Sequence, residues 1–130
     1  MLSAALRVAR AAVNRVTANR ATANRAQCSH DRAVPGYRVP GSMRALLEAR
    51  DQYCGFPPCR RPAAACDLDH TIPYDQGGLT CLCNLYPHCR RHHQLKGLRT
   101  WRVTQPSPGQ LAWRTPAGLI YRADPSAHPW

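Results

Sequence analysis

The sequence has few acidic residues, a single lysine and no long apolar run. Asp and Glu together number 7 against 18 Lys and Arg, and Lys96 is the one lysine. No segment approaches the roughly 18 uncharged apolar residues that a membrane-spanning helix needs. The first uncharged run, residues 1–6, is shorter than the apolar core of about 7–15 residues in a secretory signal. These absences exclude a transmembrane protein, argue against export, and make the cytoplasm the expected location.

Phenylalanine is also scarce, with one Phe in 130 residues, although apolar residues make up 44% of the chain. A chain of this size can build only a small core, so we expect a metal or disulfides to support the fold. The cysteine count is 7. An odd number of cysteines without an export signal is a poor basis for a disulfide framework, and clustered Cys and His in a reducing compartment favour metal binding.

The charge is strongly positive, at +11. An excess of cations on so small a body points to a polyanionic partner, either nucleic acid or an anionic membrane surface. Arginine in place of lysine fits phosphate recognition, because the guanidinium group can pair with two phosphate oxygens at once. A GC-rich genome would also enrich arginine, so the composition alone does not decide between these explanations.

The chain divides into three parts. Residues 1–34 form a basic, low-complexity arm in which arginine recurs every five residues from Arg10 to Arg25. On a helix this step gives no apolar stripe, so we expect the arm to be disordered or marginally helical. It either contacts phosphates or is an extension without a role, and we favour the latter. The Pro- and Gly-rich segment 35–41 opens a domain expected over 35–125, and 126–130 form a tail.

Local patterns predict an α+β fold. A helix over 42–52 would have Ser42 as its N-cap, and residues 66–72 alternate as a strand does. Trp101, Trp113 and Tyr121 are expected to pack in the core. The other expected elements are a loop at 73–80, a short strand at 84–86, a helix at 89–98, and strands at 101–105, 111–114 and 119–122 that form an antiparallel meander.

Cys54-x4-Cys59 and Cys89-x2-His92 have the spacing of a structural zinc site. Zinc takes four nitrogen or sulfur ligands in a tetrahedron. Positions 89 and 92 are three apart on a predicted helix, so both side chains can reach one ion. We therefore predict that these four residues hold Zn²⁺ and fix the preceding turn to the helix.

A second constellation consists of Asp69, His70, Asn84 and His93. His93 is rotated about 100° from His92 on the helix, so it is free for another task. The carboxylate of Asp69 and the imidazole of His93 could hold a hard divalent cation. His70 could then act as a general base, with a pKa near working pH.

These residues resemble a known family. The strings CDLDHTIPYDQGG and NLYPHCRRHHQLK are similar to the HNH endonuclease motif. The wider segments, VPGSMRALLEARDQYCGFPPCRRPAAACDLDH and TWRV followed by LAWRTPAGLIY, resemble the carboxy-terminal part of actinobacterial 13E12-repeat (DUF222-type) HNH proteins. The resemblance covers about residues 35–125. It implies a zinc-stapled ββα-metal, treble-clef-like core with a preceding helix and a carboxy-terminal meander.

The same resemblance implies a role for each residue in hydrolysis of DNA phosphodiester bonds. His70 matches the general base, and Asn84 the asparagine that fixes the loop and the orientation of the imidazole. Asp69 and His93 match the ligands of a catalytic divalent ion, usually Mg²⁺ or Mn²⁺. The structural zinc ligands, as the spacing also predicts, are Cys54, Cys59, Cys89 and His92. Arg90 and Arg91 project from the other side of the helix, where they either contact the DNA backbone or form a solvated basic face.

Several residues depart from this pattern. Cys83 stands where many relatives carry an acid, and Cys66 and Cys81 are additional. Cys81-x-Cys83 either competes for zinc or consists of free thiols, and we favour free thiols; Cys28 is expected to be an incidental thiol. His30 and His128 are expected to be exposed, and His88 is expected to have no special role. Two alternatives to a nuclease stay open at this point: a non-catalytic zinc-containing module that binds nucleic acid, and a truncated remnant of a larger HNH protein.

Overall fold

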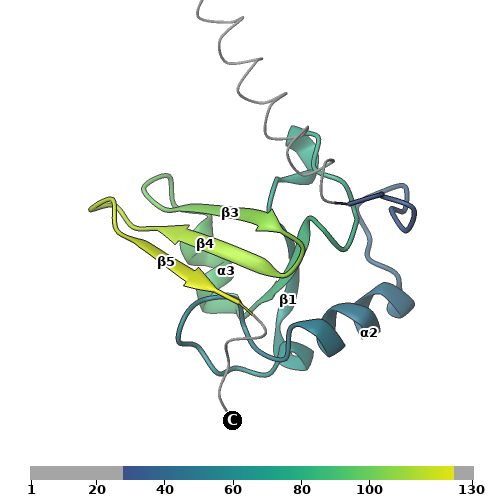
Figure 1. The fold of residues 1–130 in the computed structure, drawn as a ribbon, viewed down its shortest axis with the longest axis horizontal. Helices are drawn as coiled ribbons and strands as arrows, with labels where there is room; N and C mark the ends of the chain where they lie inside the picture. The colour runs from purple at the N-terminus through teal and green to yellow at the C-terminus, as the bar shows by residue number, and fades with distance from the viewer. Residues whose placement is uncertain (1–27, 125–130) are drawn as a thin grey trace, which may run out of the picture.

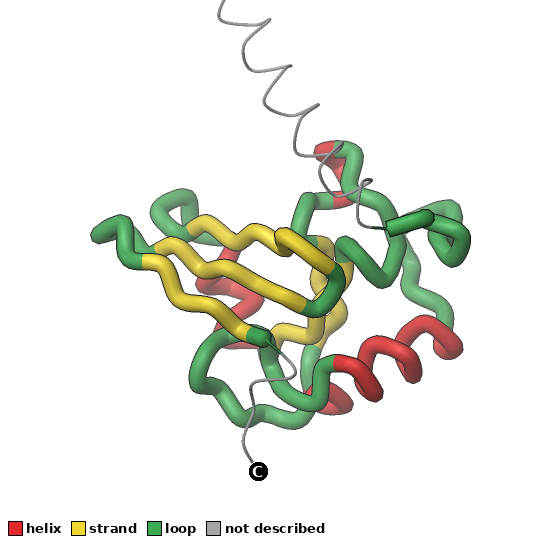
Figure 2. Tube along the Cα trace, viewed as in Figure 1, coloured by secondary structure: helices red, strands yellow, loops and turns green. Residues whose placement is uncertain are grey.

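The computed structural model describes residues 28–124, and its fold is mixed α and β (Figure 1). These residues form two α-helices, two short 3-10 helices and five strands, and the strands pair into two antiparallel sheets. Figure 2 colours the helices red and the strands yellow. In chain order they are α2 (Gly41–Arg50), η1 (Ala63–Ala65), β1 (Asp67–His70), η2 (Tyr74–Gln76), β2 (Leu85–His88), α3 (Arg90–Lys96), β3 (Arg102–Ser107), β4 (Gln110–Arg114) and β5 (Ile120–Ala123). The expectation of a mixed fold with helices and antiparallel sheets is confirmed.

Helix α2 packs its apolar face on β2. Met43 and Leu47 lie one turn apart and bury against Leu85, as i and i+4 positions on one helix face do. The prediction that Ser42 caps this helix is wrong. The N-cap is Pro40, no side chain caps it, and Ser42 lies inside the first turn.

Strands β1 and β2 pair antiparallel, with Asp69 opposite Tyr86 and His70 opposite Leu85. Successive side chains in a strand point to opposite faces, so the two faces of β2 contact different elements. Leu85 packs against α2, whereas Tyr86 packs in the cluster that includes Leu111 and Trp113 of β4. All four residues of β2 are buried, since both faces of the strand are covered. Among residues 28–124, strand β1 pairs with β2 alone, so no strand covers its second edge.

The three-stranded sheet β3–β4–β5 is the expected meander. Trp113 is fully buried in a cluster with Tyr86 and Leu111, and Trp101 packs against that cluster. The indole Nε1 of Trp113 donates to the carbonyl of Gly55 at 2.9 Å. The expectation that Tyr121 is a core residue is wrong, because it is 52% exposed on the edge strand β5.

The predicted arm and tail lie mostly outside the described residues. Residues 1–27 and 125–130 are not described, so their predicted character stays a prediction. Within the described part, residues 28–34 contact the loop before β2. Val34 forms an isolated antiparallel bridge with Thr80, and its amide donates to the Thr80 carbonyl at 3.0 Å. The contacts of the folded body therefore extend back to this segment.

Candidate metal centres and active site

The four predicted zinc ligands come together. Cys54 and Cys59 lie in the turn before β1, Cys89 is the N-cap of α3, and His92 is in its first turn. Nδ1 of His92 is 3.4 Å from Sγ of Cys54 and 3.2 Å from Sγ of Cys89. One ligand atom from each of the four lies within 4.8 Å of every other. Bonds of about 2.0 Å to nitrogen and about 2.3 Å to sulfur put two tetrahedral ligand atoms about 3.5–3.8 Å apart. This group could hold a metal ion.

Packing positions the histidine of this first metal group. The ring of Phe56 stacks on His92, with centroids 4.1 Å apart, and meets Trp113 edge-on at 5.0 Å. The amide of Cys89 donates to Sγ of Cys54 at 3.3 Å. Cys66 lies beside the group, but its thiol donates to the carbonyl of Pro62 at 3.4 Å, and burial raises its pKa to about 11. Cys66 is therefore a neighbour of the group and not one of its members.

A second group of the same composition includes two cysteines of the 71–84 loop, which joins β1 to β2. Cys28, His30, Cys81 and Cys83 place their ligand atoms within 4.8 Å of one another, so they too could hold a metal ion. None of the seven cysteines is in a disulfide, and three of them are gathered here. The sequence offered zinc binding by Cys81 and Cys83 as the less favoured alternative, but it did not indicate that Cys28 and His30 join them. The expectation that His30 is exposed is wrong, because its side chain is part-buried and its Nε2 atom is fully buried.

Asp69 lies at the centre of a polar cluster. Its Oδ2 accepts from Nδ1 of His88 at 3.1 Å and pairs with Nζ of Lys96 at 2.8 Å. Burial opposes ionisation of this carboxyl, but the hydrogen bond from His88 and the charge of Lys96 outweigh it and lower its pKa. Because Oδ2 is already engaged, Oδ1 is the oxygen left to face the groove.

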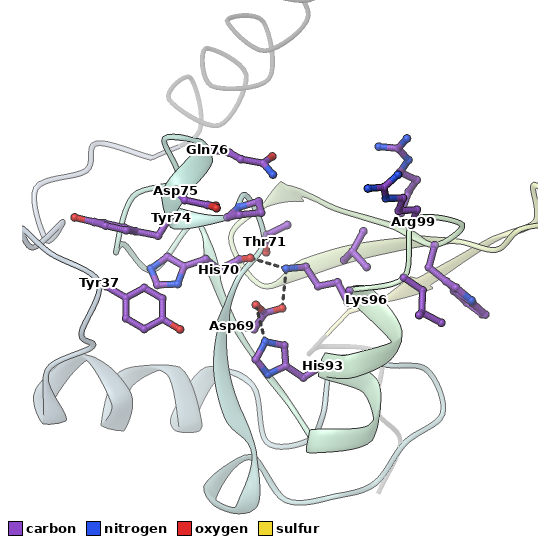
Figure 3. Close-up of a pocket in the computed structure, with 16 residues that line it drawn as sticks. Tyr37, Asp69, His70, Thr71, Tyr74, Asp75, Gln76, His93, Lys96 and Arg99 are labelled. Atoms are coloured by element: carbon purple, nitrogen blue, oxygen red, sulfur yellow. Dashed lines mark hydrogen bonds and ion pairs between the residues drawn. The ribbon is translucent and has the colours of Figure 1, made fainter.

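His93 reaches the same carboxylate from α3. Its Nε2 is 3.4 Å from Oδ1 of Asp69, and its Nδ1 is 3.0 Å from Oδ2 of Asp67 (Figure 3 shows the first contact). Mg²⁺ binds its ligands at about 2.0–2.1 Å with near-octahedral angles, so neighbouring ligand atoms lie about 3 Å apart. The predicted pair Asp69 and His93 is thus brought together, with Asp67 orienting the imidazole from its other nitrogen.

His70 lies on the opposite side of β1 from Asp69, as alternation predicts (Figure 3). Tyr37 stacks on its ring, with centroids 5.1 Å apart. Nε2 of His70 is 2.9 Å from Oγ1 of Thr80, and that hydroxyl donates its one hydrogen to the carbonyl of Gly36 at 2.6 Å. His70 must therefore be the donor in its contact with Thr80, which assigns the proton to Nε2 and the lone pair to Nδ1. Burial lowers the pKa of His70, the charge of Asp69 opposes this, and that of Lys96 adds to it.

Asn84 fixes the loop but does not orient the imidazole directly. Its Oδ1 accepts from the amide of Ile72 at 2.8 Å, and its Nδ2 donates to the carbonyls of Ile72 and Leu79 at 3.0 and 2.9 Å. The expected contact with His70 is instead made by Thr80. Asn84 therefore acts on His70 through the loop that carries Thr80.

An open groove of about 690 Å³ runs around the free edge of β1, with Asp69, His70, His93 and Lys96 in its lining (Figure 3). A second groove of about 500 Å³ shares Tyr37, His70 and His93 with it. Because β1 pairs on one side only, groups on both of its faces can reach the same space. The two grooves also contain six cations: Lys96, Arg99 and Arg102 in the first, and Arg38, Arg44 and Arg90 in the second.

The two predicted DNA-binding arginines differ in placement. Both are exposed. Arg90, however, shares a face of α3 with His93, lines the second groove and pairs with Asp67 at 3.3 Å. The prediction that it projects from the other side of the helix is wrong, since residues three apart lie on one helix face.

Sequence reasoning missed several residues that build this site. Lys96 was detectable, because the one lysine of the chain falls three residues after His93 on the same helix face. The expectation that His88 has no special role is wrong, because it is fully buried and donates to Asp69. Thr80 and Tyr37 gave no signal in the sequence, since each reaches His70 only through tertiary contacts.

The fold and the two Cys/His groups define a small mixed α and β protein that could hold metal ions. Curated proteins of Mycobacterium tuberculosis are similar to it. The uncharacterized protein Rv3776 is 39% identical over 97 residues, which cover 74% of this chain and 18% of the relative. The uncharacterized protein Rv2100 is 38% identical over 96 residues, which cover 73% of this chain and 17% of the relative.

The chain thus spans less than a fifth of the length of these curated relatives. No family model matches the sequence, and no solved structure matches it. None of the helices among residues 28–124 is long and apolar enough to cross a membrane.

Proposed function

We propose that this protein is a metal-dependent HNH endonuclease that hydrolyses DNA phosphodiester bonds, of the kind found at the carboxy terminus of 13E12-repeat (DUF222-type) proteins. One observation carries the proposal. Oδ1 of Asp69 and Nε2 of His93 converge to 3.4 Å beside His70, in a groove around the edge of a β–β–α unit. A zinc-stapled fold alone requires none of these contacts.

The donor set suits a hard divalent cation, because it joins a carboxylate oxygen to an imidazole nitrogen. Asp69 and His93 would hold Mg²⁺ or Mn²⁺, which when bound supplies charge stabilisation at the scissile phosphate and the leaving 3′ oxygen. Lys96 and His88 keep Asp69 ionised and leave its Oδ1 free for this role. They are positioning residues.

His70 would be the general base. Its Nε2–H is committed to Thr80, so Nδ1 has the lone pair that takes a proton from the attacking water. Burial lowers the pKa of His70, which favours the neutral, proton-accepting imidazole at neutral pH. Tyr37 stacked on one face of the ring and Thr80 at Nε2 fix its orientation.

The substrate assignment to DNA rests on charge. Six cations line the two grooves that meet at His70 and His93. Such a distribution suits a phosphate backbone that passes on both sides of the reacting bond, because phosphate contacts position a nucleic acid without reading its sequence. Arg91 is exposed on α3 but lines neither of these two grooves, so it is not counted among these cations.

The rival function is a non-catalytic module that uses the first metal group as zinc and the same arginines to bind nucleic acid. It predicts retention of DNA but no turnover. The convergence of Asp69 and His93 favours the nuclease over this module. We expect the protein to act in the cytoplasm, where a reducing environment preserves thiolate ligands.

Cleavage of supercoiled plasmid tests the proposal. Zinc-loaded protein should nick or linearise DNA when Mg²⁺ or Mn²⁺ is added, and an Asp69→Asn variant should lose at least 100-fold of that rate. Asp75→Asn is the matched control, since Asp75 lines the same groove but is not assigned to the ion. Folded wild-type protein that shifts DNA in a gel and never cleaves it would identify the binding module instead.

A further inference from the structure

The group formed by Cys28, His30, Cys81 and Cys83, here the second metal group, consists of two short pairs. Cys28-x-His30 precedes the domain helix α2, and Cys81-x-Cys83 lies in the loop before β2. They meet across 53 residues of sequence: Sγ of Cys28 is 3.7 Å from Sγ of Cys81, and Nδ1 of His30 is 3.5 Å from Sγ of Cys83. These four residues belong neither to the first metal group nor to the residues assigned to the proposed nuclease chemistry.

We propose that the second metal group is a structural zinc site that fixes the loop carrying Thr80, and so holds His70 in its reactive orientation. Its role toward His70 rests on the proposed nuclease function; its zinc binding does not.

The separations match tetrahedral zinc. Zn–S bonds of about 2.3 Å place two sulfurs about 3.8 Å apart, and a sulfur and a nitrogen about 3.5 Å apart; the two observed distances are 3.7 and 3.5 Å. A disulfide would need about 2.05 Å between sulfurs. Three thiols with one imidazole form a soft donor set that selects zinc over Mg²⁺ or Ca²⁺.

The surroundings resemble those of the first metal group. The amide of His30 donates to Sγ of Cys28 at 3.4 Å, as the amide of Cys89 does to Cys54 at 3.3 Å. Such bonds stabilise a thiolate and orient it. His30 also adopts a left-handed backbone with φ of 58°, and its Nε2 is buried without a hydrogen-bond partner among residues 28–124. The imidazole is thus turned into the cluster, where its Nδ1 contacts Cys83.

The consequence for His70 follows from chain connectivity. Cys81 directly follows Thr80, whose Oγ1 accepts from His70, and Cys83 directly precedes Asn84, whose side chain closes the loop. The opposite partners, Cys28 and His30, lead into the segment that bonds Thr80 at Val34 and Gly36. An ion shared by the two pairs would therefore fix the 71–84 loop, which carries Thr80, and the segment 34–36, which bonds to Thr80.

Metal stoichiometry of the full chain provides the first test. Native mass spectrometry of protein purified with zinc under reducing conditions should show two zinc ions per chain. Cys83→Ser should show one, whereas Cys66→Ser, a buried thiol outside both groups, should keep two. One ion in the wild-type protein, unchanged by Cys83→Ser, would overturn the proposal, as would a mass lower by about 2 Da that reveals a disulfide in place of the second ion.

Hydrogen exchange tests the consequence independently of cleavage. In Cys83→Ser, the amide of Val34, bonded to the carbonyl of Thr80, should exchange at least tenfold faster, while the amide of Gly55, bonded to Pro87 beside the first metal group, keeps its rate. Plasmid cleavage should fall at least tenfold in the same variant. Unchanged Val34 exchange would refute the structural role. A wild-type protein with two zinc ions that never cleaves DNA would refute the nuclease and leave the second site standing.

Discussion

Replacing the Thr80 hydroxyl with a methyl group, as in Thr80→Val, isolates the contact that orients the proposed base. The shape of the side chain is kept, but Nε2–H of His70, in a residue only 4% exposed, loses its acceptor. An unsatisfied buried donor costs about 1–3 kcal/mol. If the same loss applies to the transition state, the cleavage rate falls about 5- to 150-fold. The carbonyl of Gly36, the other partner of this hydroxyl, belongs to an exposed residue, so water can replace that bond.

The assay compares single-turnover plasmid cleavage and urea unfolding for a set of variants. Thr80→Ser keeps the hydroxyl and should retain the wild-type rate within about threefold. Thr71→Val is the matched control, because the Thr71 hydroxyl accepts from Gln105 at 2.9 Å and not from His70; it should lose stability with a smaller loss of rate. The zinc content of all three should stay at the wild-type value. A Thr80→Val protein that cleaves DNA at the wild-type rate would refute the orientation of His70 described here.

The remaining predictions concern the first metal group, the 71–84 loop and the basic grooves. Cys59→Ser should lose one zinc ion and the cooperative fold, because structural zinc binding contributes directly to folding. Cys66→Ser should keep its zinc content and its fold. A folded, zinc-replete Cys59→Ser protein would remove Cys59 from the ligand set. Gly78→Ala should lower Tm and cleavage sharply, because its Cβ would lie 1.8 Å from a backbone carbonyl oxygen; Gly41→Ala, with nothing within 4 Å, should be neutral or stabilising, and equal melting temperatures would contradict this reading of the loop. DNA affinity should fall with salt at about −0.9 in log–log slope per phosphate contact, and Arg99→Ala should make that slope shallower by about one; a salt-independent affinity would contradict backbone binding.

The first metal group was predictable because its ligands occur as close pairs. Cys54 and Cys59 share one turn, and Cys89 and His92 share the first turn of a helix, so only the meeting of two pairs was left to tertiary structure. Local spacing likewise indicated the meander and the order β1, β2, α3. The second metal group contains pairs just as short, and zinc binding by Cys81 and Cys83 was an alternative at the sequence level. Cys28, however, lies in a segment whose composition indicates no fixed structure, so the sequence did not join it to that pair.

The errors have specific physical causes. Ser42 is a good capping residue by type, but the N-cap lies two residues earlier, at Pro40. Tyr121 follows the apolar alternation of a strand, but β5 is an edge strand and leaves its ring exposed. The orientation of His70 depends on Thr80, whose own partner, Gly36, is 44 residues away. Contacts of that separation have no local signature in one sequence.

Plasmid cleavage by wild-type protein and by His70→Ala, with DNA binding and zinc content measured on the same samples, tests the central claim most directly. The account predicts Mg²⁺- or Mn²⁺-dependent nicking or linearisation by the wild type. It predicts that His70→Ala loses this cleavage but binds DNA and zinc as the wild type does. Equal cleavage by the two proteins would contradict the assignment of His70 as the base, and no cleavage by folded, metal-loaded wild type would contradict the nuclease itself.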